Sequence, residues 1–160
     1  MSKRADALAN RIEEGAQALA SFAEVLSDEE WKTIVPNDKR TVGVLVHHVA
    51  SAYSGEIDLA QTLASGDPVA GVTWDMIDQI NAHHVQEHGS VDQGKTVAML
   101  RQNSKVAADA VRAFSDEELD RAAQISLNAD APLTTQFFIE DHALSHSFHH
   151  LANIRAALGR

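Results

Sequence analysis

The stretch from Thr134 to Leu158 reads TTQFFIEDHALSHSFHHLANIRAAL, and it decides the fold of this 160-residue chain. It contains neither proline nor glycine, and Gly159 follows it directly. A long run without helix breakers that is closed by a glycine predicts an α-helix. This helix is rich in one functional side chain, because it carries His142, His146, His149 and His150.

Four further stretches are expected to be helical, namely residues 3–26, 41–64, 73–88 and 96–114. In each, apolar side chains recur at helical spacing, and the three prolines fall in different gaps between the helices. Only Gln124–Leu127 offers a candidate strand. Four long helices and one short one predict an all-α protein, an antiparallel four-helix bundle with one additional short helix. We expect one domain over residues 1–160.

The motif Ser-Asp-Glu-Glu occurs twice, at residues 27–30 and 115–118. Each copy follows a long helix, and the first is expected to form a capping box that starts a short turn. The two copies are compatible with a faint internal repeat of helical hairpins, or equally with two generic helix N-caps.

The composition excludes several classes of function. The formal net charge is −10, whereas a non-specific nucleic-acid binder needs clustered basic residues. No cysteine is present, so the chain has no disulfide, no thiolate zinc site and no thiol nucleophile of its own. No apolar run approaches the roughly 18 residues of a membrane span. The first residues lack the apolar segment of a signal peptide, so a cytoplasmic protein is expected.

All nine histidines fall in three short segments, residues 47–48, 83–88 and 142–150. Each helical residue advances the side-chain direction by about 100°, so spacing predicts which way a side chain faces. His48 shares its face with small and apolar residues and is expected on the core stripe. His47 is displaced by about 100° toward polar residues and is expected to be solvated.

The histidines of the last helix fit within an arc of about 100°. Two imidazoles at positions i and i+4 can point at one metal ion, with Zn–N bonds of roughly 2.1 Å. A third ligand must come from another helix, and His48 is the natural candidate. A single histidine on an apolar face is more often a hydrogen-bonded core residue, but a buried cluster of imidazoles favours a metal site.

Three other polar side chains are expected to line a pocket beside this site: His84, His149 and Asn153. His84 shares one face of the short helix with Asn81 and His88, and it is expected to form a wall or to hydrogen-bond another side chain. Asn153 falls in the histidine stripe of the last helix.

Two segments, TVGVLVHHVA at 41–50 and HSFHHLAN at 146–153, resemble the motifs of the DinB-like superfamily of metal-binding four-helix bundles. That family typically has a histidine in its second helix and an H-x-x-H-H run in its last. The positions of this chain that match the family's usual histidine triad are His48, His146 and His150. The family's Arg-Gly-Gln is Leu151-Ala-Asn153 here, so the arginine of that motif is missing from this chain.

The resemblance implies one divalent ion, such as zinc, nickel, iron or manganese. It also implies a thiol transfer or isomerisation on a small-molecule substrate with a low-molecular-weight thiol such as mycothiol or bacillithiol. Three neutral ligands would leave an open position for this chemistry. We expect His142 to be the candidate proton carrier or a partner that orients a ligand. Glu56 could also orient a ligand, although a solvated position is expected.

Other functions fit the sequence less well. A di-iron oxidase needs Glu-x-x-His pairs, and neither Glu87 nor Glu140 has a histidine three residues later. The H-E-x-x-H motif of zinc proteases is also missing. The competing hypothesis is a non-enzymatic bundle that binds a metal or a ligand. Apolar residues away from the histidine stripe predict a homodimer; they are Phe137, Leu144, Phe148 and Leu151.

Overall fold

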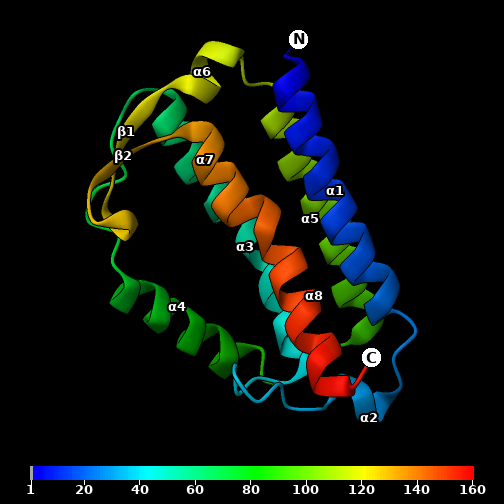
Figure 1. Ribbon diagram of the computed structural model, residues 1–160. Coiled ribbons are helices and arrows are strands. Elements are labelled where there is room, and N and C mark those ends of the chain that lie inside the picture. Colours follow the sequence, from blue (N-terminus) through cyan, green and yellow to red (C-terminus); the bar gives the residue numbers. More distant parts are fainter. Residues whose placement is uncertain (1) are drawn as a thin grey trace.

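The computed structural model describes residues 2–160, and its long helices lie side by side in a bundle (Figure 1). The first three long helices are α1 (Lys3–Ala23), α3 (Val42–Ala64) and α5 (Gln93–Arg112). The fourth is the C-terminal helix, which consists of α7 (Thr135–Ile139), the π-helical segment η2 (Glu140–Leu144) and α8 (Ser145–Leu158). The predicted four-helix bundle is therefore confirmed.

The helices do not pack in simple chain order. α1 packs against α5 and α8, and α3 packs against α5 and the C-terminal helix, so α1 and α3 are diagonally opposed. Figure 1 shows that α1 and the C-terminal helix run down the page while α3 and α5 run up it. Each helix therefore has one parallel and one antiparallel neighbour, while the two diagonal pairs are antiparallel.

The helix ends follow the local chemistry of the sequence. A side-chain oxygen of Ser2, Thr41 or Asp92 accepts a hydrogen bond from the first turn of α1, α3 or α5. Both Ser-Asp-Glu-Glu motifs form capping boxes, which start the short helices α2 (Asp28–Trp31) and α6 (Asp116–Asp120). Two capping boxes thus account for the repeated motif.

The C-terminal helix departs from the regular helix that was expected. The amide of Ser145 donates to the carbonyl of Glu140, five residues earlier, which defines a π turn. Such a turn contains one extra residue, so side chains before it are rotated by roughly 100° relative to those after it. His142 lies inside this segment.

A small hairpin interrupts the helical pattern. Strands β1 (Ala122–Ile125) and β2 (Ala131–Thr134) pair antiparallel, with Ala122 opposite Thr134. The expectation of no strand beyond a candidate at 124–127 was therefore wrong. Short strands with few β-branched residues show little of the alternation of apolar and polar side chains from which a strand is predicted. The turn between them, which includes the 3-10 helix η1 (Ser126–Asn128), contains two residues with positive φ, Ala129 and Asp130.

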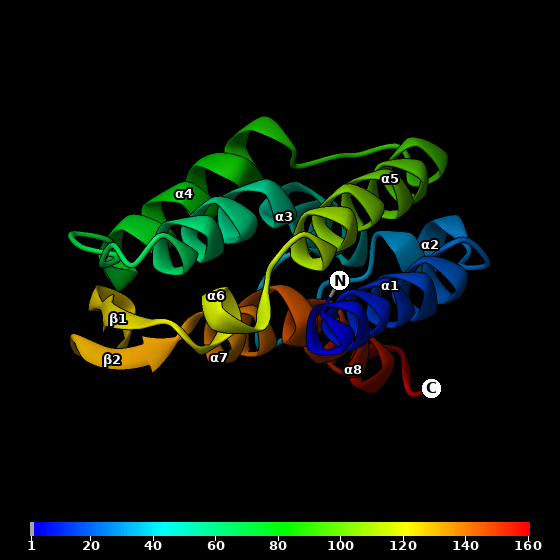
Figure 2. The same ribbon diagram turned by 90° about the horizontal axis from the view of Figure 1, so that it is seen from above.

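The short helix α4 (Trp74–Glu87) stands apart from the bundle. None of its residues, all of which the structure describes, is buried. Figures 1 and 2 show it outside the bundle on the side of α3, with its start near the hairpin and its end toward the opposite end of the bundle. At its start, the indole nitrogen of Trp74 donates to the carbonyl of Leu127 at 3.0 Å.

Among residues 2–160, no helix has the length and apolar character that crossing a membrane requires.

Candidate metal centre

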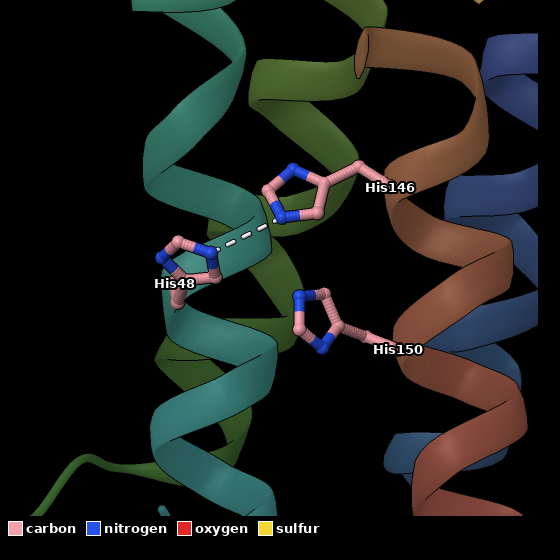
Figure 3. A group of neighbouring side chains, drawn as sticks. All are labelled: His48, His146 and His150. Atoms are coloured by element: carbon pink, nitrogen blue, oxygen red, sulfur yellow. Dashed lines mark hydrogen bonds between the residues drawn. The ribbon is translucent and has the colours of Figure 1, made fainter. Parts of the chain in front are cut away.

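Three histidines from two facing helices come together between these helices. One ring nitrogen from each of His48, His146 and His150 lies within 4.8 Å of the other two, and within the described part of the chain no other trio meets this criterion. His48 projects from α3, and the other two project from α8, one turn apart. Figure 3 shows the three rings pointing toward one another across the space between these helices.

The spacing of the ring nitrogens is close to that required to bind one metal ion. Nε2 of His48 lies 3.1 Å from Nε2 of His146. Two nitrogens bound to one tetrahedral zinc ion lie about 3.4 Å apart when each Zn–N bond is about 2.1 Å. Only a small opening of this contact would therefore admit an ion.

The environment keeps two of the imidazoles uncharged. Burial, together with the nearby His146 and Arg40, lowers the pKa of His48 to about 2. Burial likewise lowers the pKa of His150 to about 3. Neutral imidazole is the form that binds a metal, so both side chains are ready to act as ligands at neutral pH.

Two carboxylates approach the outer nitrogens of the triad. Oε1 of Glu56 lies 2.9 Å from Nδ1 of His146, although the contact does not have hydrogen-bond geometry. Oδ2 of Asp38 lies 3.9 Å from Nδ1 of His150. Carboxylates in this position orient a metal-binding histidine and raise its basicity. Glu56 was expected to be solvated and is instead 15% exposed, so that expectation was wrong.

A positive charge also lies beside the triad. Arg40 forms an ion pair with Asp38 in the loop before α3. Its Nη1 is buried and has no hydrogen-bond partner among the described residues. The guanidinium contributes to the low pKa of both His48 and His150. Neither Asp38 nor Arg40 was predicted, because a loop has no periodicity from which facing can be calculated.

His142 does not join the triad. Its ring stacks on Phe138 with the centroids 4.3 Å apart, and its Nε2 is buried without a hydrogen bond in the described structure. Burial lowers its pKa. His142 lies inside the π turn, so its direction does not follow the regular helical spacing that relates His146 to His150.

The residues expected to line a pocket occupy different positions. His84 is half-buried, and its Nε2 lies 2.8 Å from Nδ1 of His47 in a hydrogen bond. His47 is thus half-buried and paired, whereas it was expected to be solvated. His149 is exposed, and its Nε2 accepts from the Asn153 amide at 3.2 Å. The latter two side chains therefore pair with each other at the surface and do not enclose the triad.

Comparisons with known proteins give the family and the fold of the chain. The sequence profile of the DinB superfamily matches residues 11–154. The solved structure of YfiT from Bacillus subtilis, described as a probable metal-dependent hydrolase with an unusual four-helix bundle topology, superposes with a TM-score of 0.79. Sequence identity is 20%, and the match covers 100% of this chain and 89% of YfiT. No curated protein matches the chain.

Proposed function

Since this chain belongs to the DinB superfamily, we propose that it is an enzyme that holds one divalent metal ion through His48, His146 and His150. The observation that carries this proposal is the convergence of three ring nitrogens within 4.8 Å. Zinc, nickel, iron and manganese all accept imidazole nitrogen, so the ligand set does not select among them.

The donor set fits such an ion. Nδ1 of both His146 and His150 is buried without a hydrogen bond among the described residues, yet each faces a carboxylate oxygen. Small ring rotations would convert these contacts into N–H···O hydrogen bonds, which leave Nε2 free as a ligand. Three protein ligands leave room for one more, which is typical of catalytic rather than structural sites.

The proposed reaction is a thiol-dependent transfer or isomerisation of a small molecule. A divalent ion at the triad would supply Lewis acidity that lowers the pKa of a bound thiol or water. The chain contains no cysteine, so the thiol must be an external low-molecular-weight compound. Such thiols are kept reduced in the cytoplasm, where we place the protein.

Several side chains would assist this chemistry. Glu56 would hold the His146 ring in place. The buried guanidinium of Arg40 would favour an anionic ligand, such as a thiolate, beside the three imidazoles. His142 remains the candidate proton carrier, because its buried Nε2 has no hydrogen-bond partner among the described residues.

Hydrolysis is a second candidate, favoured by the structural likeness to YfiT, a probable metal-dependent hydrolase. The same three ligands would then activate water instead of a thiol. A non-enzymatic metal or ligand binder is the remaining alternative, and it would not need an exchangeable coordination position.

The test begins with elemental analysis of untagged protein purified without an immobilised-metal column. About one ion per chain is expected for a site of this kind. Cobalt is then substituted, and its visible spectrum is recorded with and without added thiols. A spectral change on adding thiol supports an open position and thiol chemistry. Absence of metal uptake would overturn the metal site, while a bound ion whose spectrum no thiol alters would favour the hydrolase or the binder.

We further propose that the protein is a homodimer and does not bind nucleic acid. Phe137 and Phe148 on the C-terminal helix are 41% and 40% exposed, which supports an interface there. Leu151 lies in the bundle core and Leu144 is half-buried, so these two side chains offer less surface to a dimer interface than was expected. A monomeric mass by light scattering at tens of micromolar protein would contradict the dimer.

A further inference from the structure

A second group of histidines lies beside the triad and shares no residue with it. It consists of His47 on α3, His84 on α4 and His88, which caps the end of α4. The ring centroid of His88 lies 4.3 Å from that of His47 and 5.1 Å from that of His84. Three imidazoles from two elements thus gather within one small volume.

Their nitrogens have few other partners. Nδ1 of His47 and Nε2 of His84 share one hydrogen bond at 2.8 Å. Ser51 Oγ makes a longer contact of 3.3 Å with the same His47 nitrogen, but its hydroxyl already donates to the His47 carbonyl. Nδ1 of His84 is buried without a hydrogen bond in the described structure.

We propose that His47, His84 and His88 form a second binding site for a divalent transition-metal ion, which fastens α4 to α3. Imidazole nitrogen is a good ligand for zinc, copper and nickel. The hydrogen-bonded nitrogens of His47 and His84 need to separate from 2.8 Å to about 3.4 Å to bind one ion with tetrahedral geometry. This inference does not rest on the proposed enzymatic function.

The second site is expected to bind more weakly than the triad. Its three rings do not place a nitrogen each within 4.8 Å of one another, so His88 must move inward. α4 buries none of its described residues and can shift to allow this movement. The ring centroids of His48 and His84 are 5.8 Å apart, so an ion in the triad would repel the second one. The positive charge of Arg40 also acts on His84 and would oppose a cation there.

Binding at this site has a structural consequence for α4. Its first turn is tied to the hairpin through Trp74, and its far end meets the bundle through His84 and His88. An ion shared by α3 and the end of α4 would replace one hydrogen bond by metal–ligand bonds. The helix would then be held firmly at both ends.

The experiment is calorimetric titration of metal-free, full-length protein with Zn²⁺. The wild-type protein is expected to bind two ions per chain, the second more weakly. The double variant with His84→Ala and His88→Ala should lose the weaker event, or bind that ion at least about tenfold more weakly, and keep the tighter one. His83→Ala is the matched control, because His83 lies on the same helix and its side chain is 67% exposed.

Hydrogen exchange of the α4 amides gives an independent readout. Their protection should rise with the second equivalent of Zn²⁺ in the wild-type protein and in His83→Ala, but not in the double variant. His150→Ala should lose the tight event and retain the weak one, so failure of the triad can be distinguished from failure of this site. A single ion per chain in the wild-type protein, or a second event unchanged in the double variant, would overturn the proposal.

Discussion

Oε1 of Glu56 on α3 lies 2.9 Å from Nδ1 of His146 on α8, so a carboxylate of one helix reaches a proposed metal ligand of the facing helix. The Glu56→Gln substitution keeps the size of the side chain and removes its charge. Metal affinity should fall by about 10- to 100-fold while the fold is retained. Competition with a chromophoric chelator measures this affinity, and circular dichroism checks the fold. An unchanged affinity would mean that Glu56 does not orient His146.

Removal of any one triad histidine should abolish metal retention. We expect His48→Ala, His146→Ala and His150→Ala each to release the ion during gel filtration, because two imidazoles hold a divalent ion much more weakly than three. His47→Ala should retain about one ion per chain. Elemental analysis of the purified variants provides the measurement, and equal loss in His47→Ala would contradict the assignment of the triad.

The stability of the metal-free protein should depend on pH in a defined direction. The pKa of His48 is lowered to about 2 and that of His150 to about 3, whereas an unfolded histidine titrates near 6.5. Below about pH 6.5 the unfolded chain therefore binds protons that the folded chain does not, and the free energy of unfolding decreases. Between pH 6.5 and 5 the loss is up to about 2 kcal/mol per buried imidazole.

Urea denaturation at a series of pH values measures this slope. The His150→Asn variant should show a shallower slope, because it lacks one of the two buried imidazoles. His83→Asn should leave the slope unchanged, since the His83 side chain is 67% exposed. A free energy of unfolding that stays constant from pH 7 to 5 would contradict the prediction.

Two glycines of α3 should respond in opposite ways to the same substitution. A Cβ at Gly43 would lie 2.5 Å from the indole of Trp31, which is buried and donates to the carbonyl of Val91. Gly43→Ala should therefore cost about 1–3 kcal/mol. Gly55 has no atom within 4 Å of the added Cβ, so Gly55→Ala should stabilise by about 0.5–1 kcal/mol. Thermal and urea unfolding measure both, and equal effects would refute the packing argument.

His142 can be tested as the proton carrier independently of metal binding. His142→Gln should leave about one ion per chain, because the ring faces Phe138 and not the triad. If His142 transfers a proton, kcat for the reaction identified in a thiol screen falls and its pH profile loses one limb. Unchanged kcat with an unchanged pH profile would assign His142 a structural role.

Regular helical spacing predicted the bundle and placed His48 and the histidines of the last helix on inward faces, while the family resemblance selected His146 and His150 among them. α3 is regular around His48, and α8 is regular between its two ligands. Facing calculations therefore hold there. Asp38 and Arg40 could not be found in this way, since they lie in a loop whose path depends on tertiary contacts. Glu56 was wrongly expected to be solvated, because its angle on α3 does not show whether its long side chain can contact α8.

His47 and His142 depart from regular-helix expectations for different physical reasons. His47 does face away from the core of the bundle, but α4 lies along the outside of α3 and supplies His84 as a partner. No periodicity within one helix predicts a neighbour from another. The calculated direction of His142 assumed a regular helix, and the sequence gives no sign of the π turn that contains it.

The π turn allows one continuous helix to bury two sets of side chains that a regular α-helix could not place on the same face. After it, the buried residues Ser147, His150 and Ile154 follow the usual period, and before it Thr135, Phe138 and Ile139 do as well, but offset by one residue. Deleting one residue from 140–144 would restore a regular helix and force a choice between the two halves. Either the apolar start of the helix would leave the core, or both imidazoles would swing away from His48. The extra residue thus lets the start of the helix bury its apolar side chains while His146 and His150 near its end still face His48.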